Sequence, residues 1–488
     1  MNKLLDICRS VPGQQVTVAK AEAELGLRDL RRAGESGAWE AAGSLEGPWL
    51  PEELSARPVL LLFRDAAREV FAGTQPEVSP VAKVEHFTAA LQLLDARNFP
   101  PPEEKNRMDR ELLRQAPTLA DAWRALLKPM LEGAQAEAAK QVPNVFTNTG
   151  QSLDPASGRP SEREVFRGRE SCIQQVADAL EQPKVSLAVI GPRRVGKTSL
   201  LKMITVFLPG DIFVYVDLQS GAGASPEAFC KALDTQLTEA LRRHTGVTVP
   251  RLGSRLNPAG TAEWIAELEA AAVRHRVVFC IDEYERLEAL WSGGAQELTQ
   301  LLALIRSTIQ HRNNVRFLIA GASPLADLPP LWTDHFISAQ EIRVDFLDHD
   351  CAIGLLRKPS QSFPDGTISQ EVAEAIYART AGQPHLLQTF GFRVVQRINK
   401  EERKIVTLDD VQAVEDRVLQ DANNTFADYR NAPPSAQRAL ESLARDQSPV
   451  WEPGMKHWLR QHGYLTADST LRVPLFKTWL RRFLEERE

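Results

Sequence analysis

Cysteine is scarce in this sequence of 488 residues, which contains only five of them. They lie far apart and form no Cys-x-x-Cys pair, and they are Cys8, Cys172, Cys230, Cys280 and Cys351. This spacing argues against both a zinc ribbon and a disulfide framework. We interpret Cys280 as a small apolar filler inside a buried strand. The few scattered thiols fit a reducing compartment, and we expect a cytoplasmic protein.

Long apolar runs and a charge excess of one sign are also missing. No apolar stretch is long enough for a membrane span, and the first residues hold no apolar run typical of a secretory signal. The formal net charge is −6, so no global positive field points to nucleic acid. With 43% hydrophobic and 25% charged residues, the composition is that of a globular protein. The length predicts about three domains.

One motif carries clear chemistry. The segment Gly191-Pro192-Arg193-Arg194-Val195-Gly196-Lys197-Thr198 matches the phosphate-binding P-loop pattern in full. It follows a predicted strand over 186–190, and Ser199 continues into a predicted helix. The glycines let backbone N–H groups surround a phosphate chain, and the helix N-terminus adds a partial positive charge. We expect Lys197 to contact the β- and γ-phosphates and the Thr198 hydroxyl to hold Mg²⁺.

A second motif is an apolar strand that ends in two acids. Residues 276–283 read Arg-Val-Val-Phe-Cys-Ile-Asp-Glu. In P-loop folds an acid at this place holds the Mg²⁺ ion, and we predict this role for Asp282. Glu283 is then the candidate that orients or deprotonates the attacking water. We find no Asn-Lys-x-Asp motif that reads guanine after this strand, so ATP or ADP with Mg²⁺ is the predicted ligand.

Strands and helices alternate over residues 164–347, the predicted P-loop ATPase core. The predicted strands are 186–190, 212–217, 277–281, 315–320 and 341–346. The predicted helices between them include 226–243, 262–274 and 296–312. Apolar runs separated by amphipathic helices predict an α/β fold, with a parallel sheet covered on both faces. Ligand then binds at the carboxyl ends of the strands, where the P-loop and Asp282 lie.

The flanking regions are predicted to be helical. Residues 1–142 form a mainly helical N-terminal effector or adaptor domain, with helices over 59–71, 84–96, 107–114 and 120–139. A small helix-turn-helix unit that starts at 16–25 is an alternative for part of it. Residues 143–163 are rich in Pro, Ser, Gly and Asn, which predicts an exposed linker.

Two further domains are predicted after the core. Residues 348–432 form a helical lid, with helices over 368–380, 384–399 and 408–419, the last one capped by Thr407. Residues 433–488 show two helices, a short hairpin and a closing helix, the pattern of a winged-helix domain.

Taken together, these motifs resemble the STAND class of AAA+-related P-loop ATPases, in its prokaryotic branch with a C-terminal winged helix. The resemblance covers roughly residues 160–488. It rests on Phe166-Arg167-Gly168-Arg169-Glu170, the P-loop, the Ile-Asp-Glu strand, Arg357-Lys358-Pro359 and Ala381-Gly382-Gln383-Pro384-His385-Leu386-Leu387-Gln388. The resemblance implies that Phe166 and Arg169 lie near the adenine. It also implies that Pro384 and His385 face the nucleotide from the lid.

One departure from related ATPases concerns the fourth strand. Related enzymes often end it with an arginine that touches the γ-phosphate, whereas here Ser323 stands at that end. A hydroxyl binds phosphate without neutralising its charge, so we expect slow hydrolysis. Arg193 and Arg194 are candidates to compensate, unless they are surface charge. The candidates for an arginine finger toward a neighbouring protomer, with solvated helix charge as the alternative, are Arg306, Arg312 and Arg316.

Two functions remain open from the sequence. The resemblance implies a signalling switch, closed with ADP, that opens and forms a homo-oligomer after exchange to ATP. Its implied setting is bacterial stress or anti-phage defence, with a trigger or protein partner at the N-terminal domain. The alternative is a DNA-handling ATPase, similar to a replication initiator or a transposition helper. Residues 434–488 carry nine Lys or Arg against seven acids, a small excess that favours the switch.

Overall fold

The computed structural model describes residues 39–40, 57–76, 78, 80–99, 107–155, 160–241, 250–271, 275–287, 295–336 and 339–487. The predicted helix-turn-helix segment 16–25 and Cys8 lie outside them. The chain divides into two units, Met1–Asn144 and Val145–Glu488. The domain boundaries drawn from the sequence remain predictions.

The N-terminal unit is helical over its described residues. It contains α4 (Arg57–Thr74), α5 (Pro80–Leu93), the short 3-10 helix η1 (Ala96–Asn98) and α6 (Arg107–Lys140). The predicted helices over 59–71 and 84–96 are confirmed in position. The prediction of two helices over 107–114 and 120–139 is wrong, because one continuous helix spans both.

The long helix α6 continues through two prolines, Pro117 and Pro129. A proline in a helix interior removes a backbone hydrogen bond and is costly. The face that carries Ala120 and Trp123 is fully buried, and the Trp123 ring meets that of Phe63 at 5.1 Å, edge to face. Tertiary packing of this face offsets the cost of the prolines and overrides the local signal to stop.

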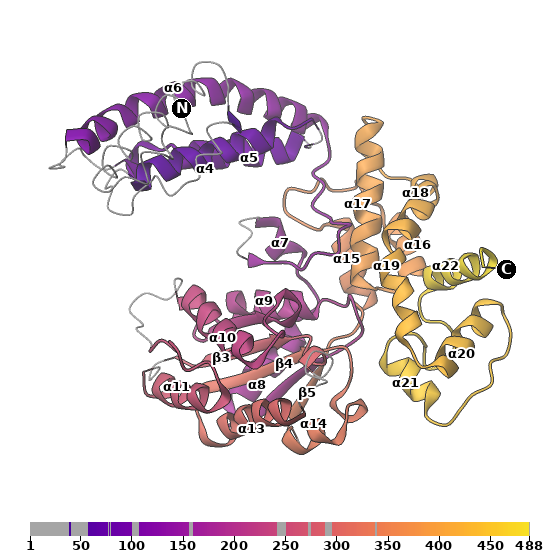
Figure 1. Ribbon diagram of the computed structural model, residues 1–488. Coiled ribbons are helices and arrows are strands. Elements are labelled where there is room, and N and C mark those ends of the chain that lie inside the picture. The colour runs from indigo at the N-terminus through magenta and orange to yellow at the C-terminus, as the bar shows by residue number, and fades with distance from the viewer. Residues whose placement is uncertain are drawn as a thin grey trace. The chain divides into compact units, whose positions relative to one another are not determined.

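In the second unit, five parallel strands form one sheet (Figure 1). They are β1 (Ser186–Ile190), β2 (Ile212–Asp217), β3 (Val277–Asp282), β4 (Val315–Gly321) and β5 (Ala339–Arg343), in the order β2-β3-β4-β1-β5. The first four match the predicted strands closely. The fifth was expected over 341–346 and lies two to three residues earlier. Just after the strand, the Val344 N–H still donates to the Ile190 carbonyl, and the Leu347 N–H then donates to the Gly382 carbonyl.

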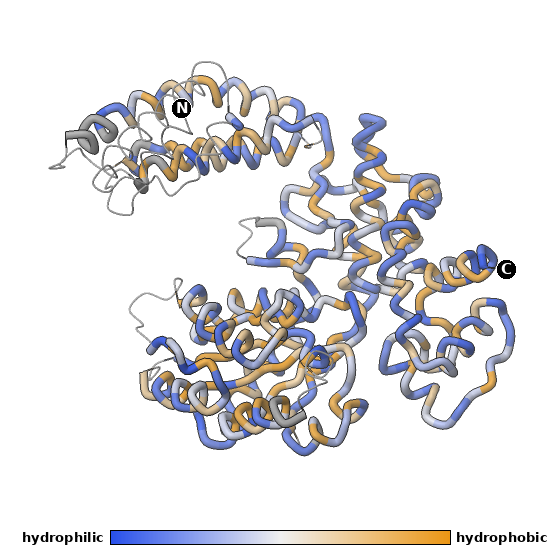
Figure 2. Tube along the Cα trace, viewed as in Figure 1, coloured by the Kyte–Doolittle hydropathy of each residue, from blue (hydrophilic) through white to orange (hydrophobic). Residues whose placement is uncertain are grey.

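Helices cover both faces of this sheet. One face carries α8 (Glu170–Glu181) and α9 (Lys197–Phe207), and the other carries α10 (Pro226–Leu241), α11 (Pro258–Ala271) and α13 (Ala295–His311). Successive strand residues point to opposite faces, and in β1 to β4 both sets are mainly apolar, which Figure 2 shows in orange. The edge strand β5 is more polar, and only Ile342 of it is buried. The predicted doubly covered parallel sheet is therefore confirmed, and it fits the α/β fold of a P-loop NTPase.

Helices also follow the sheet in sequence. They are α15 (His349–Arg357), α16 (Gln370–Thr380), α17 (Pro384–Lys400) and α18 (Leu408–Asp421). The predicted N-cap is confirmed. The Thr407 side chain accepts from the Asp410 N–H, and the Asp410 side chain accepts from the Thr407 N–H, which completes a capping box.

The last residues form α19 (Asn423–Phe426), η5 (Ala427–Asn431), α20 (Pro434–Ala444), α21 (Met455–Gln461) and α22 (Pro474–Glu485). Between α21 and α22, Leu465 and Leu471 form an antiparallel bridge. The winged-helix assignment remains a prediction. Across the described residues, no helix combines the length and the apolar character that a membrane crossing requires.

The segment before α7 (Pro160–Val165) differs from the exposed linker that the sequence predicted. Phe146 is only 4% exposed, and its ring meets that of Phe363 edge to face at 5.8 Å. A Cβ placed on Gly391 of α17 would lie 2.6 Å from the same ring, so the glycine makes room for it. The prediction of exposure is therefore wrong at this residue, because the lid offers a pocket that local composition does not announce.

Candidate functional site

The P-loop connects the carboxyl end of β1 to the first turn of α9. A Cβ on Gly191 would lie 2.0 Å from the Val344 carbonyl oxygen, so only glycine fits there. Gly196 has a φ of +100°, which glycine adopts without strain. These two glycines fix the loop around the side chain of Lys197.

Lys197 is buried inside this loop, with 5% of its surface exposed. Its ammonium donates to the carbonyl oxygens of Gly191 at 2.9 Å and Pro192 at 3.0 Å. Burial lowers the pKa of Lys197, and the nearby Glu283 carboxylate opposes this shift. The loop thus holds the ammonium at the place where P-loop proteins bind the phosphates of a nucleotide.

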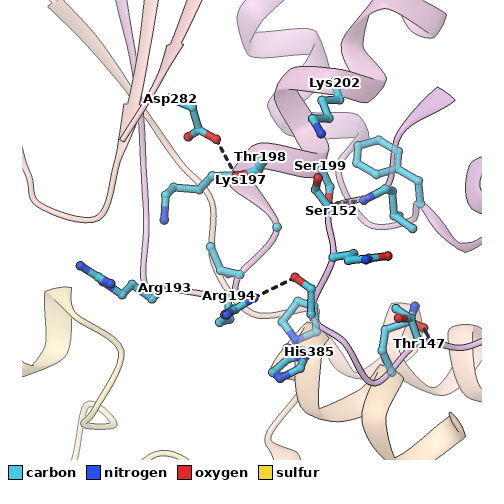
Figure 3. Close-up of a pocket in the computed structure, with 18 of the residues that line it drawn as sticks. Thr147, Ser152, Arg193, Arg194, Lys197, Thr198, Ser199, Lys202, Asp282 and His385 are labelled. Atoms are coloured by element: carbon cyan, nitrogen blue, oxygen red, sulfur yellow. Dashed lines mark hydrogen bonds between the residues drawn. The ribbon is translucent and has the colours of Figure 1, made fainter. Parts of the chain in front are cut away.

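Asp282 ends β3 beside the P-loop and contacts Thr198 directly (Figure 3). The Thr198 hydroxyl donates to Asp282 Oδ2 at 2.6 Å, and the Tyr215 hydroxyl donates to the same oxygen at 3.0 Å. Burial raises the pKa of Asp282, while the two hydrogen bonds counteract this rise.

This donor set suits Mg²⁺. The ion prefers oxygen ligands, and proteins usually supply one or two of them while phosphates and water complete the shell. The Thr198 hydroxyl and the Asp282 carboxylate are such ligands. The described residues contain no group of three or more His, Cys, Asp or Glu side chains that would cage a metal by themselves. The residues present therefore fit a Mg²⁺ ion that arrives with its nucleotide.

Glu283 follows directly and lines the same cavity. Its φ of +59° places a non-glycine residue in the left-handed region, which is costly. Its N–H donates to Asp282 Oδ1 at 3.1 Å. Strain of this kind persists where the surroundings enforce it, and it clusters at functional sites.

A cavity of about 440 Å³ opens over the P-loop. Basic side chains outnumber acidic ones on its walls, seven against three, so the cavity suits a polyanion. The basic ones are Arg167, Arg169, Arg193, Arg194, Lys197, Lys202 and Arg286, and the acidic ones are Asp217, Asp282 and Glu283.

The structure brings most of the predicted site residues together on these walls. They are Phe166, Arg169, Arg193, Arg194, Val195, Gly196, Lys197, Thr198, Ser199, Asp282, Glu283, Pro384 and His385. Arg169 is buried and donates from Nη2 to the Val195 carbonyl at 2.8 Å, which braces the P-loop from outside. Burial lowers the pKa of Arg169. The adenine contacts expected of Phe166 and Arg169 remain predictions.

His385 faces the cavity from the first turn of α17. Its side chain is buried, and this burial, followed by the charge of Arg194, lowers the pKa of His385 to about 4. The imidazole is therefore neutral near pH 7 and can offer one donor and one acceptor.

Some residues that the sequence predicted for the site lie outside this cavity. Ser323 and Pro192 line a neighbouring cavity of about 240 Å³, where the Ser323 carbonyl accepts from the Tyr284 hydroxyl. Among the finger candidates, Arg316 is 4% exposed and donates to the Arg312 carbonyl, at the opposite end of β4 from the P-loop. Because Arg316 is buried, it cannot serve as an arginine finger toward a neighbouring protomer. Arg306, another candidate, donates to the Asp334 carbonyl, and its role stays a prediction.

Sequence reasoning missed several residues of this site. Asp217 ends β2 in register with Asp282 on the next strand and lines the same cavity. Its signal was present, because strand 212–217 also ends in an acid. Gln388 ends the Ala381–Gln388 motif, but the sequence assigned it no role at the site. Tyr215 and the cavity-lining residues Thr147, Gly150, Gln151, Ser152 and Leu153 belong to no motif that would have marked them.

Comparisons with known proteins match one part of the chain. A family model described as an AAA domain matches residues 180–328. A search of curated proteins finds no match to the chain. The walker-type ATPase PABY2304 of Pyrococcus abyssi is similar in structure, with 17% identity, coverage of 68% of this chain and 98% of that chain, and a TM-score of 0.49.

Two further solved structures were found. The ORC2 protein of Aeropyrum pernix has 10% identity, coverage of 66% and 95%, and a TM-score of 0.42. The RuvB Holliday junction branch migration motor of Thermotoga maritima has 17% identity, coverage of 67% and 92%, and a TM-score of 0.37. The P-loop, the parallel sheet and the family match together make residues 180–328 an AAA-type P-loop ATPase domain.

Proposed function

We propose that this protein is a STAND-type signalling switch that binds and slowly hydrolyses ATP. With ADP it is closed, and after exchange to ATP it opens and assembles with further copies of itself. The observation that carries this proposal is that the P-loop is contacted by Gln383 before α17, by Asp428 of η5 and by Gly463 after α21.

The contact with the lid is made by Gln383. Its side-chain amide donates to the Arg194 carbonyl at 3.3 Å, while its Oε1 caps α17 by accepting from the Leu386 N–H at 2.7 Å. One residue thus joins the P-loop backbone to the start of a lid helix. A change of P-loop conformation on nucleotide exchange would act on this helix directly.

Arg193 and Pro192 make the contacts of the P-loop with η5 and with the residue after the end of α21. The Arg193 Nε lies 3.2 Å from Asp428 Oδ2, and both side chains are partly exposed, so the pair alone contributes little. Gly463 adds close packing, because a Cβ there would lie 2.7 Å from Pro192. Arg472 pairs with Asp345 at 2.7 Å on the same side of the core. Several weak contacts of this kind suit a reversible closure.

The proposed chemistry uses the residues of the cavity. Lys197 would bind the phosphates, and Thr198 and Asp282 would hold a Mg²⁺ ion. The ion would neutralise negative charge on the phosphates. Glu283 orients a water molecule and accepts its proton. Ser323 stands in the neighbouring cavity and brings no positive charge, which supports slow turnover.

Mass photometry of the full chain with ADP, and with a non-hydrolysable ATP analogue, tests the switch. We expect mainly monomers with ADP and larger assemblies with the analogue. Lys197→Ala is the control, and it should respond to neither nucleotide. The same mass distribution under both conditions, in a protein shown to bind both, would overturn the switch while leaving the ATPase assignment intact.

The DNA-handling alternative finds less support. Several basic side chains of the C-terminal helices are already paired with acids, since Lys477 and Arg481 contact Asp446 and Arg482 contacts Asp416. These pairs reduce the positive charge that this region can offer to DNA phosphates. Tight, salt-sensitive binding of a short DNA duplex would instead favour this alternative.

A further inference from the structure

Residues 147–154, named the clasp here, cross the nucleotide cavity between the start of the second unit and α7. Thr147, Gly150, Gln151, Ser152 and Leu153 all line the cavity. Figure 3 shows Thr147 and Ser152 among the lining side chains. The clasp thus forms part of the wall of a site whose other walls come from the P-loop, the strand ends and the lid.

Hydrogen bonds fasten the clasp to the P-loop and its helix. The Arg194 Nη1 donates to the Gly150 carbonyl at 2.8 Å. The Leu153 N–H donates to the Ser199 hydroxyl at 3.0 Å, and Lys202 Nζ lies 3.3 Å from Asp154. Ser199 and Lys202 belong to the first two turns of α9, the end of a helix at which P-loop proteins bind phosphates. The clasp therefore runs beside the phosphate-binding end of this helix.

The opposite end of the clasp is fastened to the lid. The Thr147 N–H donates to Gln388 Oε1 at 3.2 Å, next to the buried ring of Phe146. The clasp thus bridges the core and the lid over the cavity.

Gly150 is the central residue of the clasp, and its backbone is special. Its φ is +64°, and a Cβ there would lie 2.5 Å from Arg194 Nη1 and 3.2 Å from His385 Cε1. A methyl group would therefore push the guanidinium away from the Gly150 carbonyl. The close approach of clasp, P-loop and lid depends on glycine at this position.

We propose that the clasp is a part of the nucleotide-binding site that retains a bound nucleoside diphosphate by covering its phosphate side. Arg194 has further N–H donors, so it can hold the Gly150 carbonyl and a phosphate oxygen together. Bound nucleotide then orders the clasp, and the clasp slows its release. The clasp lies within the second unit, a few residues after its start at Val145. This proposal rests on the proposed nucleotide binding.

The test is the release of a fluorescent ADP analogue from the full chain, chased with unlabelled ADP. Gly150→Ala should release the analogue at least about tenfold faster. This change corresponds to a barrier to release that is lower by about 1.4 kcal/mol. Gly366→Ala is the matched control. Gly366 also has a positive φ, of +79°, but its Cβ would meet no atom within 4 Å. The control therefore shares the backbone strain without touching the cavity.

Hydrogen exchange of residues 147–154 in the unmodified protein supplies the second measurement. We expect ADP to slow exchange there as well as in the P-loop. Equal release rates for Gly150→Ala and the unmodified protein would overturn the clasp, as would P-loop protection without protection of 147–154. Equal acceleration by Gly366→Ala would also overturn it, because strain alone would then explain the effect. An unmodified protein that binds no ADP would instead refute the proposed function itself.

Discussion

At the scale of single residues, Lys197 is the least replaceable side chain of the cavity. Its ammonium is buried among loop carbonyls and is pre-positioned for phosphate. We predict that Lys197→Ala weakens Mg-ATP binding by at least about tenfold, because a fixed cation is lost. Isothermal titration calorimetry measures this directly. Unchanged affinity in a folded variant would contradict the assignment of the P-loop.

Glu283 is predicted to act on water rather than on nucleotide affinity. Glu283→Gln keeps the size of the side chain but cannot accept a proton, so turnover should fall by about 100-fold or more while ATP affinity stays within about twofold. Phosphate release and ATP binding, measured on the same preparation, separate the two effects. A variant that hydrolyses ATP as fast as the parent would show that another residue serves as the base.

The neutral state of His385 predicts a pH dependence of stability. Burial lowers the pKa of His385 to about 4. As the pH falls below the ordinary histidine pKa of about 6.5, the unfolded chain therefore binds a proton more readily than the folded chain. Stability from this residue is fully present above about pH 6.5 and is lost as the pH falls toward 4, by up to about 3 kcal/mol. His385→Gln should therefore lose less stability than the parent between about pH 7.5 and pH 5.

His349→Gln is the control for this prediction. His349 is exposed, and its hydrogen bond to Glu374 raises its pKa, so its contribution has the opposite sign and is lost as the pH rises. Urea unfolding at both pH values measures the difference. If His385→Gln and the parent lose equal stability in acid, His385 is not held neutral by burial.

At the scale of elements, helix α18 depends on one buried carboxylate. Asp410 accepts hydrogen bonds from Thr407, Arg397 and Arg403, and it is almost fully buried. The Arg403 and Arg397 guanidinium groups and the Thr407 cap hold the pKa of Asp410 well below its usual range, against the effect of burial. We predict that Asp410→Asn destabilises this helical region by about 2 kcal/mol, because two guanidinium groups lose their buried carboxylate partner and keep only the exposed Glu401.

Asp409→Asn tests whether this loss is specific. Asp409 lies in the same first turn of α18, and its side chain is exposed. Both variants lose the interaction of an acid with the helix dipole, so that common part cancels. Thermal unfolding of the full chain should show a clear loss only for Asp410→Asn. Equal losses would mean that the dipole, and not the network, accounts for the effect.

At the scale of the whole molecule, the contact of Arg193 with Asp428 joins the P-loop to η5, the segment that precedes the last three helices. Under the proposed switch, Arg193→Ala or Asp428→Ala should raise the ratio of open to closed protein with ADP about two- to fivefold, as loss of an exposed pair allows. Mass photometry with ADP reads this as a larger oligomeric fraction. Asp416→Ala is the control. It breaks an exposed pair between α18 and Arg482 of α22, which does not involve the P-loop. Unchanged oligomer fractions in both test variants would contradict closure through this contact.

The sequence by itself determined the chemistry of the core. Four strands and the P-loop were predicted close to their observed bounds, because alternating apolar runs and glycine spacing are local properties. Asp282 and Thr198 were paired from the motif alone, and the structure brings their side chains into contact. Strand-end residues meet at one edge of a parallel sheet whatever the surrounding detail, which explains why this part was accessible.

Only the tertiary structure decided what surrounds that chemistry. The clasp lacks any periodicity, yet Thr147 bonds to Gln388, 241 residues away in the sequence. The two prolines of α6 stay within one helix because a buried face supports it, and Ser323 lines a neighbouring cavity although it lies only two residues after β4. These outcomes depend on which distant surfaces pack together, and a local pattern of polar and apolar residues carries no information about such partners.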